Sequence, residues 1–284
     1  MINSTQKRWM ILTISEQSFP ENLKQASDRN QSLLCVGLDP DSRYLGDRDL
    51  FDFCKEIVEA TVDLVSCYKL NLAFYEYHGS EGYRVVEKLV EFIDGRVPVI
   101  GDAKRNDIGN SSSFYAKGVF ETFGFDAIVV NPYLGRDSLE PFFEYTNKGI
   151  FVLCKTSNPG GGEFQNLNVL VDGKQMPLYQ VVALKAKSWN ESKNLGLVVG
   201  ATYPEEAREI RDICPEMPIL MPGIGAQGGE LESSVKASLN AEKGGLIVNV
   251  SRGVIYSSEG DDFAESARVS ADQMRRQIEL ARFK

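Results

Sequence analysis

The sequence predicts a single α/β domain folded as a (β/α)8 barrel. Eight short apolar segments alternate with eight longer amphipathic segments along 284 residues. The short segments are apolar throughout, which is typical of parallel strands covered on both faces. Eight such units favour a closed barrel over an open sheet, and a barrel of roughly 250 residues forms one domain.

The apolar runs set the expected boundaries. The expected strands are Leu33–Leu38, Cys67–Leu72, Val97–Asp102, Ala127–Asn131, Ile150–Lys155, Gly196–Ala201, Pro218–Pro222 and Leu246–Val250. The expected helices are Asp49–Ser66, Gly82–Ile93, Asn110–Thr122, Asp137–Asn147, Tyr179–Lys193, Pro204–Ile213, Leu231–Ala237 and Asp262–Arg282. Each helix follows a strand, as a parallel barrel requires.

Two segments lie outside this repeat. Residues 1–30 are expected to form an N-terminal extension whose short helix plugs the barrel floor, ahead of a catalytic barrel domain over residues 31–284. Gly160–Met176 is longer than an ordinary strand-to-helix loop and begins with glycines, which is typical of a lid or binding loop. No stretch rich in Pro, Gly or Ser divides the chain, so we expect one domain.

Composition excludes several classes of protein. The net charge of −9, without a basic block, argues against a nucleic-acid partner. No apolar run approaches the ~18 residues that span a bilayer, and the apolar stretch after Arg8 is too short for a signal peptide. We therefore expect a cytoplasmic protein without a membrane partner. The single histidine, His78, cannot build a zinc site, and the five scattered cysteines are expected to be buried thiols.

Charged residues interrupt the strands near their carboxyl ends, where the active site of a (β/α)8 barrel lies. Asp102 and Lys104 stand two positions apart and face the same way in extended backbone, while Lys69 lies in the preceding strand. Asp39 ends the first strand, and Asp107 stands where a helix begins. A helix N-cap at Asp107 and a salt bridge at the rim are the structural alternatives. Because charges near a barrel lumen are unfavourable unless paired or functional, we favour an active-site array.

Lys104 is expected to carry a permanent positive charge. It stands between Asp102 and Asp107, and flanking carboxylates favour the ammonium form and should raise its pKa. A Schiff-base lysine needs the opposite, a depressed pKa and a free amine. The ammonium group also fills the place that a divalent cation would take. The pattern therefore favours a proton donor that works without metal, imine or other cofactor.

A second group of residues suits an anion. Gly223, Gly225 and Gly228 follow the seventh strand and Arg252 follows the eighth, the place where such barrels often bind phosphate. The same glycines satisfy GxGxxG, but they come late in the chain and lack the acidic residue of a dinucleotide fingerprint. Thr156–Asn158, after the fifth strand, offer donors and acceptors for an amide edge, with ordinary turn residues as the alternative.

The charged motif resembles that of a known family. Asp102-Ala103-Lys104-Arg105-Asn106-Asp107-Ile108-Gly109 is similar to the DxKxxDI signature of the orotidine 5'-monophosphate decarboxylase family. Further motifs resemble its longer, mycobacterial-type bacterial branch: Val36-Gly37-Leu38-Asp39-Pro40-Asp41, Lys69-Leu70-Asn71-Leu72-Ala73-Phe74-Tyr75-Glu76 and Gly223-Ile224-Gly225-Ala226-Gln227-Gly228-Gly229. The resemblance extends from about Leu33 to Tyr256 and covers at least five strands.

The resemblance implies roles for individual residues. Lys69, Asp102, Lys104 and Asp107 would form a catalytic tetrad, with Asp107 reaching into the site of a partner subunit, so that a homodimer with shared sites is expected. The implied substrate-binding residues are Asp39 at a ribose hydroxyl, Ser157 at the pyrimidine, Gln227, Arg252 and the Gly225 turn at the 5'-phosphate, and Ser111, where the family usually has threonine.

The resemblance also implies the reaction. Orotidine 5'-monophosphate, a small nucleotide, would lose CO2 to give uridine 5'-monophosphate, the last step of de novo pyrimidine synthesis. No cofactor accepts the electron pair at C6, so the protein would stabilise the carbanion electrostatically and Lys104 would protonate it. The nearest rival is a Mg2+-dependent keto-sugar-phosphate decarboxylase or aldolase on a similar barrel. A catalytically silent nucleotide-binding barrel is a rival of another class.

Overall fold

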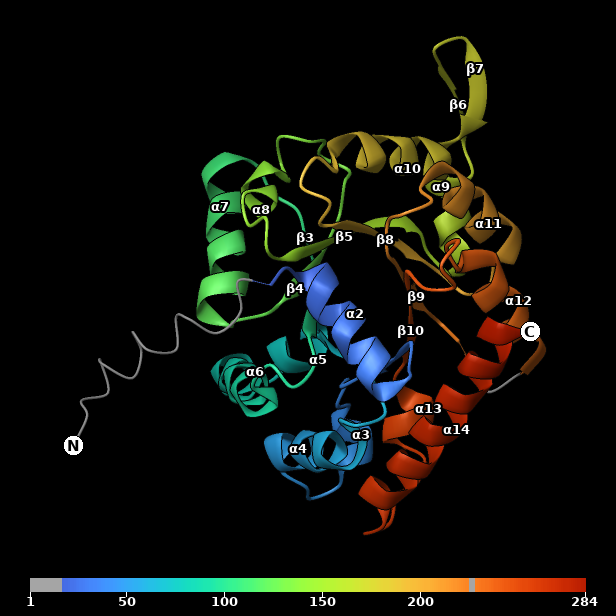
Figure 1. Ribbon diagram of the computed structural model, residues 1–284. Coiled ribbons are helices and arrows are strands. Elements are labelled where there is room, and N and C mark those ends of the chain that lie inside the picture. Colours follow the sequence, from blue (N-terminus) through green and yellow to red (C-terminus); the bar gives the residue numbers. More distant parts are fainter. Residues whose placement is uncertain (1–16, 225–227) are drawn as a thin grey trace.

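The structure is a closed barrel of parallel strands with the helices outside it (Figure 1). It is a computed structural model that describes residues 17–224 and 228–284. The strands follow one another around the barrel in the order β1, β10, β9, β8, β5, β4, β3, β2. Their bounds are β1 Leu34–Gly37, β2 Cys67–Asn71, β3 Val99–Arg105, β4 Ala127–Val130, β5 Gly149–Lys155, β8 Leu195–Val199, β9 Ile219–Pro222 and β10 Leu246–Val250. The predicted (β/α)8 barrel is confirmed.

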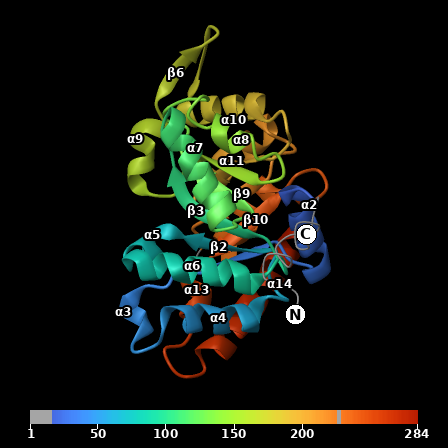
Figure 2. The same cartoon turned by 90° about the vertical axis from the view of Figure 1, so that its left-hand side faces the viewer.

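The larger helices form the outer layer (Figure 2). They are α4 Leu50–Thr61, α6 Gly79–Ile93, α7 Gly109–Lys117 with the π-helix η1 Gly118–Thr122, α10 Leu178–Trp189, α11 Pro204–Ile213, α12 Gly228–Ser238 and α14 Phe263–Phe283. Shorter helices lie in the connections: α3 Ser42–Leu45, α5 Leu72–Glu76, α8 Glu140–Phe143 and α13 Arg252–Ile255. The helix expected over Asp137–Asn147 is reduced to α8. A turn closed on the Arg136 carbonyl precedes it, and turns closed on the Phe142 and Tyr145 carbonyls follow it.

The two faces of each strand pack into different apolar layers. Leu34 and Val36 of β1 point toward the helices, whereas Cys35 between them points into the barrel. The layer inside the barrel consists of Cys35, Cys67, Ile100, Ala127, Val129, Phe151, Val198, Leu220 and Ile247. This alternation follows from the two-residue period of a strand and explains why the strand sequences are apolar throughout.

The N-terminal helix α2, Phe19–Asn30, covers the floor of the barrel (Figure 1). Ser18 and Glu21 form a capping box, which fixes where the helix begins. The Phe19 ring is 1% exposed and meets the Phe151 ring edge-on, with 5.7 Å between centroids. Gly149 leaves room for it, since a Cβ there would lie 2.4 Å from Phe19 Cδ1. The helix thereby seals the end of the barrel opposite the strand carboxyl termini.

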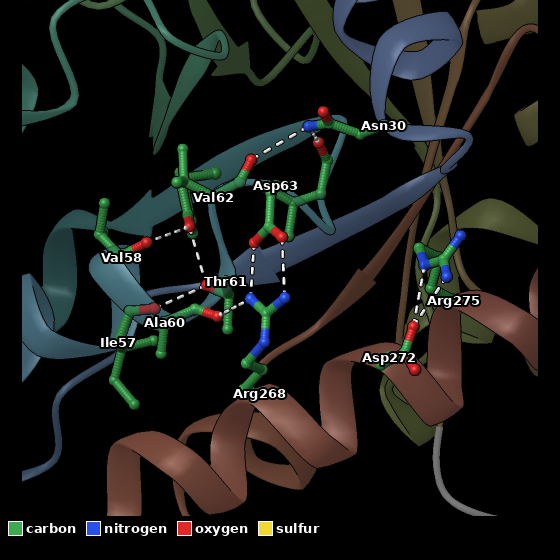
Figure 3. Close-up of polar contacts among 12 residues, drawn as sticks. Asn30, Ile57, Val58, Ala60, Thr61, Val62, Asp63, Arg268, Asp272 and Arg275 are labelled. Atoms are coloured by element: carbon green, nitrogen blue, oxygen red, sulfur yellow. Dashed lines mark hydrogen bonds and ion pairs between the residues drawn. The ribbon is translucent and has the colours of Figure 1, made fainter.

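Polar contacts join helices α2 and α14 to the end of α4 and to the turn before β2 (Figure 3). Arg268 of α14 donates to both carboxylate oxygens of Asp63 at 2.6 and 2.8 Å and to the Ala60 carbonyl at 2.6 Å. Asn30, the last residue of α2, donates to the Val62 and Val65 carbonyls. These bonds satisfy carbonyls at the carboxyl end of α4 and in the turn before β2.

A buried arginine organises the floor between β9 and β10. Arg211 of α11 is 6% exposed, and burial lowers the pKa of its guanidinium to about 10. Its guanidinium donates hydrogen bonds to five backbone carbonyls, those of Cys214, Pro215, Met217, Ser238 and Gly245. The side chain thus satisfies turns that would otherwise bury unpaired carbonyls.

The segment expected to be a long loop, Gly160–Met176, contains regular structure. It starts with the short helices η2 Pro159–Gly161 and α9 Gly162–Gln165 and continues into an antiparallel hairpin, β6 Asn168–Val171 and β7 Lys174–Pro177. The hairpin projects away from the barrel beside α10 (Figures 1 and 2). No strand was predicted in this segment, because one short alternating run of residues gives little signal for a strand.

Candidate active site

Strand register brings the charged side chains together at the carboxyl ends of β1, β2 and β3. Lys69 of β2 reaches two carboxylates, with its Nζ 3.5 Å from Asp39 Oδ1 and 3.2 Å from Asp102 Oδ2. On the other side of Asp102, Lys104 Nζ lies 2.6 Å from Oδ1. Two carboxylates and two ammonium groups therefore alternate in a continuous chain, which we call the charged array: Asp39, Lys69, Asp102 and Lys104.

The array is buried at one end and open at the other. The side chain of Lys69 is 4% exposed and that of Lys104 is 47% exposed. Burial opposes the charge of Lys69, but Asp39 and Asp102 outweigh it and raise the pKa of the ammonium group. Burial likewise raises the pKa of the Asp102 carboxyl, but Lys69 and Lys104 outweigh it, so this pKa lies below its ordinary value. Lys69 and Asp102 are therefore ionised at neutral pH.

An irregularity in β3 presents Lys104 to solvent. The pairing of β3 with β4 shifts between Gly101 and Arg105, and Lys104 has a φ of 49°, a left-handed conformation that is uncommon outside glycine. Arg105 is held by an ion pair with Glu76 and lies over the Tyr115 ring, 5.3 Å from its centroid. Such bulges commonly redirect a side chain next to an active site. Periodicity alone does not predict this turn of the backbone.

A cavity of about 240 Å3 opens above the array. Its polar wall is formed by Lys69, Asp102 and Lys104, and Ser157 stands on the opposite side. Apolar side chains from the barrel interior form its base: Val129, Leu153, Val198 and Leu220. A flat ring fits this combination of an apolar base and a charged edge.

Ser157 is held at the rim by close backbone packing. A Cβ on Gly200 would lie 2.8 Å from the Ser157 backbone nitrogen, and one on Gly223 would lie 3.1 Å from Ser157 Oγ. Both positions therefore need glycine, and Gly223 also has a φ of 92°. The ends of β5, β8 and β9 thus converge on this serine.

A second cavity, of about 560 Å3, adjoins the ends of β1, β9 and β10. Asp39, Gly223, Asn249 and Arg252 line it, and Arg252 is the first residue of α13. Asp39 connects this cavity to the charged array, because it lines the cavity and pairs with Lys69. The predicted residues Gly225 and Gln227 lie outside the described residues.

Two predicted site residues do not reach the cavities of their own chain. Among the described residues, Lys104 pairs with Asp102 and not with Asp107, so the expectation that Lys104 lies between the two carboxylates stays a prediction. Asp107 instead accepts a hydrogen bond from the Ile108 backbone at 2.8 Å, and the N-cap of α7 is Ile108. Ser111 is exposed on α7. Both residues follow the end of β3 at Arg105, and neither lines the cavity above the array or the second cavity.

Asn249 is a site residue that the sequence analysis missed. It is 5% exposed in β10, lines the second cavity and accepts a hydrogen bond from Cys35 Sγ at 3.4 Å. The signal was available, since a lone amide in Leu246–Val250 is as unusual as Lys69 in its strand. Tyr256 was also missed: its hydroxyl accepts from the Asp41 backbone at 2.5 Å and donates to the Asp39 carbonyl at 3.2 Å.

Three findings on the described residues concern metal-ligand groups, membrane-spanning helices and cysteine pairing. Within the part of the chain that the structure describes, no three His, Cys, Asp or Glu side chains are grouped as metal ligands would be. None of the described helices is both long and apolar enough to span a bilayer. All five cysteines are buried and unpaired, as predicted.

Together, the barrel and its site define a class of protein. Alternating lysine and aspartate side chains beside a cavity lined by Arg252, at the carboxyl ends of barrel strands, are the arrangement of an enzyme that acts on a small anionic molecule. Residues 32–267 match the model of the orotidine 5'-phosphate decarboxylase / HUMPS family. The chain belongs to this family, which confirms the resemblance predicted from its motifs.

Relatives extend the match over nearly the whole chain. An orotidine 5'-phosphate decarboxylase of Dehalococcoides mccartyi is 48% identical over 258 residues, covering 90% of this chain and 96% of the relative. One from Roseiflexus castenholzii is 49% identical over 271 residues, covering 93% and 98%. Among solved structures, Leishmania donovani OMP decarboxylase superposes with a TM-score of 0.83 at 38% identity, covering 94% of this chain and 100% of that one.

Proposed function

We propose that this enzyme is a carboxy-lyase that converts orotidine 5'-monophosphate to uridine 5'-monophosphate and CO2. The observation that carries the proposal is the charged array, in which Lys104 stands ionically paired to Asp102 at the edge of a ring-sized cavity. Relatives that are 48% identical over 90% of the chain are named for this reaction. The reaction completes the de novo synthesis of uridine 5'-monophosphate.

The array accounts for the chemistry without an electron sink. When the bond from C6 to the carboxylate breaks, CO2 leaves and the electron pair stays at C6 in the plane of the ring. Lys104 would stabilise this charge and then give C6 a proton from its ammonium group. Asp102 holds Lys104 in place, and Lys69 compensates the charge of Asp102. Fixed charges of this kind need no reorganisation during the reaction.

The two cavities divide the substrate between them. We assign the pyrimidine to the cavity above the array, with Ser157 at its amide edge. Asp39 would accept a ribose hydroxyl, because it lies between that cavity and the one lined by Arg252. Arg252, with the Gly225 turn and Gln227, would bind the 5'-phosphate through charge-assisted hydrogen bonds.

We further propose that the functional unit is a homodimer with shared sites. Asp107 and Ser111 line neither of the two cavities in their own chain, so they would act in the site of a partner. Large apolar side chains are exposed in the segments that follow the neighbouring strands β3 and β4: Ile108, Phe114, Tyr115, Tyr133 and Leu134. A patch of this kind is typical of a subunit interface.

Mixing two inactive variants tests the shared site. Asp107→Ala and Lys104→Ala homodimers should each be inactive, whereas random exchange of subunits should restore roughly a quarter of the active sites under two-fold symmetry. Analytical ultracentrifugation of the wild-type chain should show a dimer. A monomer that is fully active would contradict the proposal, as would the absence of complementation.

The reaction itself is tested by ultraviolet absorbance. Pure protein mixed with orotidine 5'-monophosphate should bleach the substrate band equally with and without EDTA. Loss of the activity with EDTA would favour the Mg2+-dependent keto-sugar-phosphate enzymes instead. Nucleotide binding without turnover would favour a silent barrel.

We place the enzyme in the cytoplasm, because all of its cysteines are unpaired and disulfides are rare in reducing compartments.

A further inference from the structure

Lys155, the last residue of β5, is a buried cation outside the charged array. It is 1% exposed, and among the described residues it has no carboxylate partner. A buried ammonium group is unfavourable by several kcal/mol unless neighbouring groups compensate it. Lys155 lies two residues before Ser157, and the proposed reaction assigns it no role.

The partners of Lys155 come from both ends of the segment that carries the hairpin. Its Nζ donates to Asn166 Oδ1 at 2.5 Å, and Asn166 lies two residues before β6. On the other side the Nζ lies 5.3 Å from the centroid of the Tyr179 ring, and Tyr179 lies two residues after β7. The Tyr203 ring is also close, with its centroid at 4.5 Å. One amide and two aromatic faces thus surround the ammonium group.

The segment held in this way contacts the backbone that precedes Ser157. The side-chain amide of Gln165 accepts from the Thr156 backbone at 2.9 Å and donates to Thr156 Oγ1 at 2.7 Å. Gly161 packs against the same hydroxyl, since a Cβ there would lie 2.8 Å from Thr156 Oγ1. Residues 161–166 therefore contact both Lys155 and Thr156, and Thr156 lines the cavity above the array.

We infer that Lys155 is a positioning residue for the pyrimidine end of the substrate: it fixes the base of the β6–β7 hairpin so that Thr156 and Ser157 keep their place at the cavity rim. The inference rests on the proposed function, in which Ser157 contacts the pyrimidine. It concerns one end of the ligand only, because none of the residues contacted by Lys155 lines the second cavity, with Arg252.

Two ligands distinguish this role from a merely structural one. Uridine 5'-monophosphate has a base and a phosphate, whereas ribose 5-phosphate has only the part assigned to the second cavity. Lys155→Met keeps the length of the side chain and removes its charge. We expect it to raise the Kd of uridine 5'-monophosphate about tenfold and that of ribose 5-phosphate less than about twofold, measured by titration calorimetry.

Two further variants complete the experiment. Lys185→Met removes an exposed lysine from α10 and should leave both dissociation constants unchanged. Asn166→Ala changes an exposed residue outside the barrel and should leave the fold intact. It should weaken binding of uridine 5'-monophosphate but not of ribose 5-phosphate. If Lys155→Met does not fold, Asn166→Ala tests the role of Lys155 in its place. The inference is overturned if these variants bind the nucleotide like the wild type, or lose both ligands equally. Failure of the wild type to turn over orotidine 5'-monophosphate would instead overturn the proposed function, and the inference with it.

Discussion

Lys69→Met is the most direct test of the charged array. The substitution replaces a side chain that is 4% exposed and lies 3.2 Å from Asp102 and 3.5 Å from Asp39, leaving two carboxylates without their shared cation. With an effective dielectric constant of about 20, each contact corresponds to a gross attraction of about 5 kcal/mol. Desolvation of the lysine offsets much of this, and breaking a buried ion pair typically destabilises by about 3–5 kcal/mol.

Thermal and urea unfolding at pH 7 measure the loss. We expect the free energy of unfolding to fall by about 3 kcal/mol and Tm by roughly 6–12 °C. Lys55→Met is the matched control, because Lys55 forms an exposed ion pair with Glu59 at 4.0 Å, and such pairs contribute less than about 1 kcal/mol. Equal stability of Lys69→Met and the control would refute the electrostatic reasoning.

The pH dependence of the stability difference between Lys69→Met and the wild type is a second, independent test of the array. In the wild type the pKa of Asp102 is lowered, so its contribution to stability is present above the ordinary value of 3.8 and is lost as the pH falls through the folded pKa. Without Lys69 the Asp102 carboxylate should protonate at higher pH, so the variant should gain stability relative to the wild type as the pH falls from neutrality. A difference in stability that does not change with pH would contradict this account.

Three further substitutions probe separate parts of the molecule. Lys104→Ala should abolish CO2 release while nucleotide binding stays measurable by calorimetry; near-normal turnover would remove Lys104 from the chemistry. Arg252→Ala should lower kcat/KM roughly 10- to 100-fold in steady-state assays, as loss of a charge-assisted phosphate contact does; a wild-type value would refute the phosphate assignment. Arg211→Met should destabilise the fold by about 3 kcal/mol or more in urea unfolding, because its five carbonyl partners stay buried; unchanged stability would show that water replaces the guanidinium.

The interior of the barrel was predictable because it depends on local sequence. A strand covered on both faces must be apolar at every position, so its polar exceptions are informative. Lys69 and Asp102 were recognised in this way, and Asn249 could have been recognised by the same argument. Element ends were less certain. The β3 strand extends to Arg105, three residues past its expected end, because the bulge keeps it paired with β4.

The outer connections were harder to predict because their stability comes from tertiary contacts. The β6–β7 hairpin is short, and a two-stranded hairpin is only marginally stable by itself. Its base is held by Lys155 and Tyr179, residues that belong to β5 and α10. No property of residues 160–176 alone indicates those partners.

The sequence by itself determined the barrel, the family and which side chains carry charge into the strands, since apolar periodicity and the composition of strand ends are local properties. Only the tertiary structure decided how those charges are arranged. Register placed Lys69 between Asp39 and Asp102, and the irregular stretch of β3 placed Lys104 beside Asp102. Asp107 accepts a hydrogen bond from the Ile108 backbone instead. Ion pairs form over a few ångströms between strands distant in sequence, so strand pairing and backbone conformation decide which charges meet.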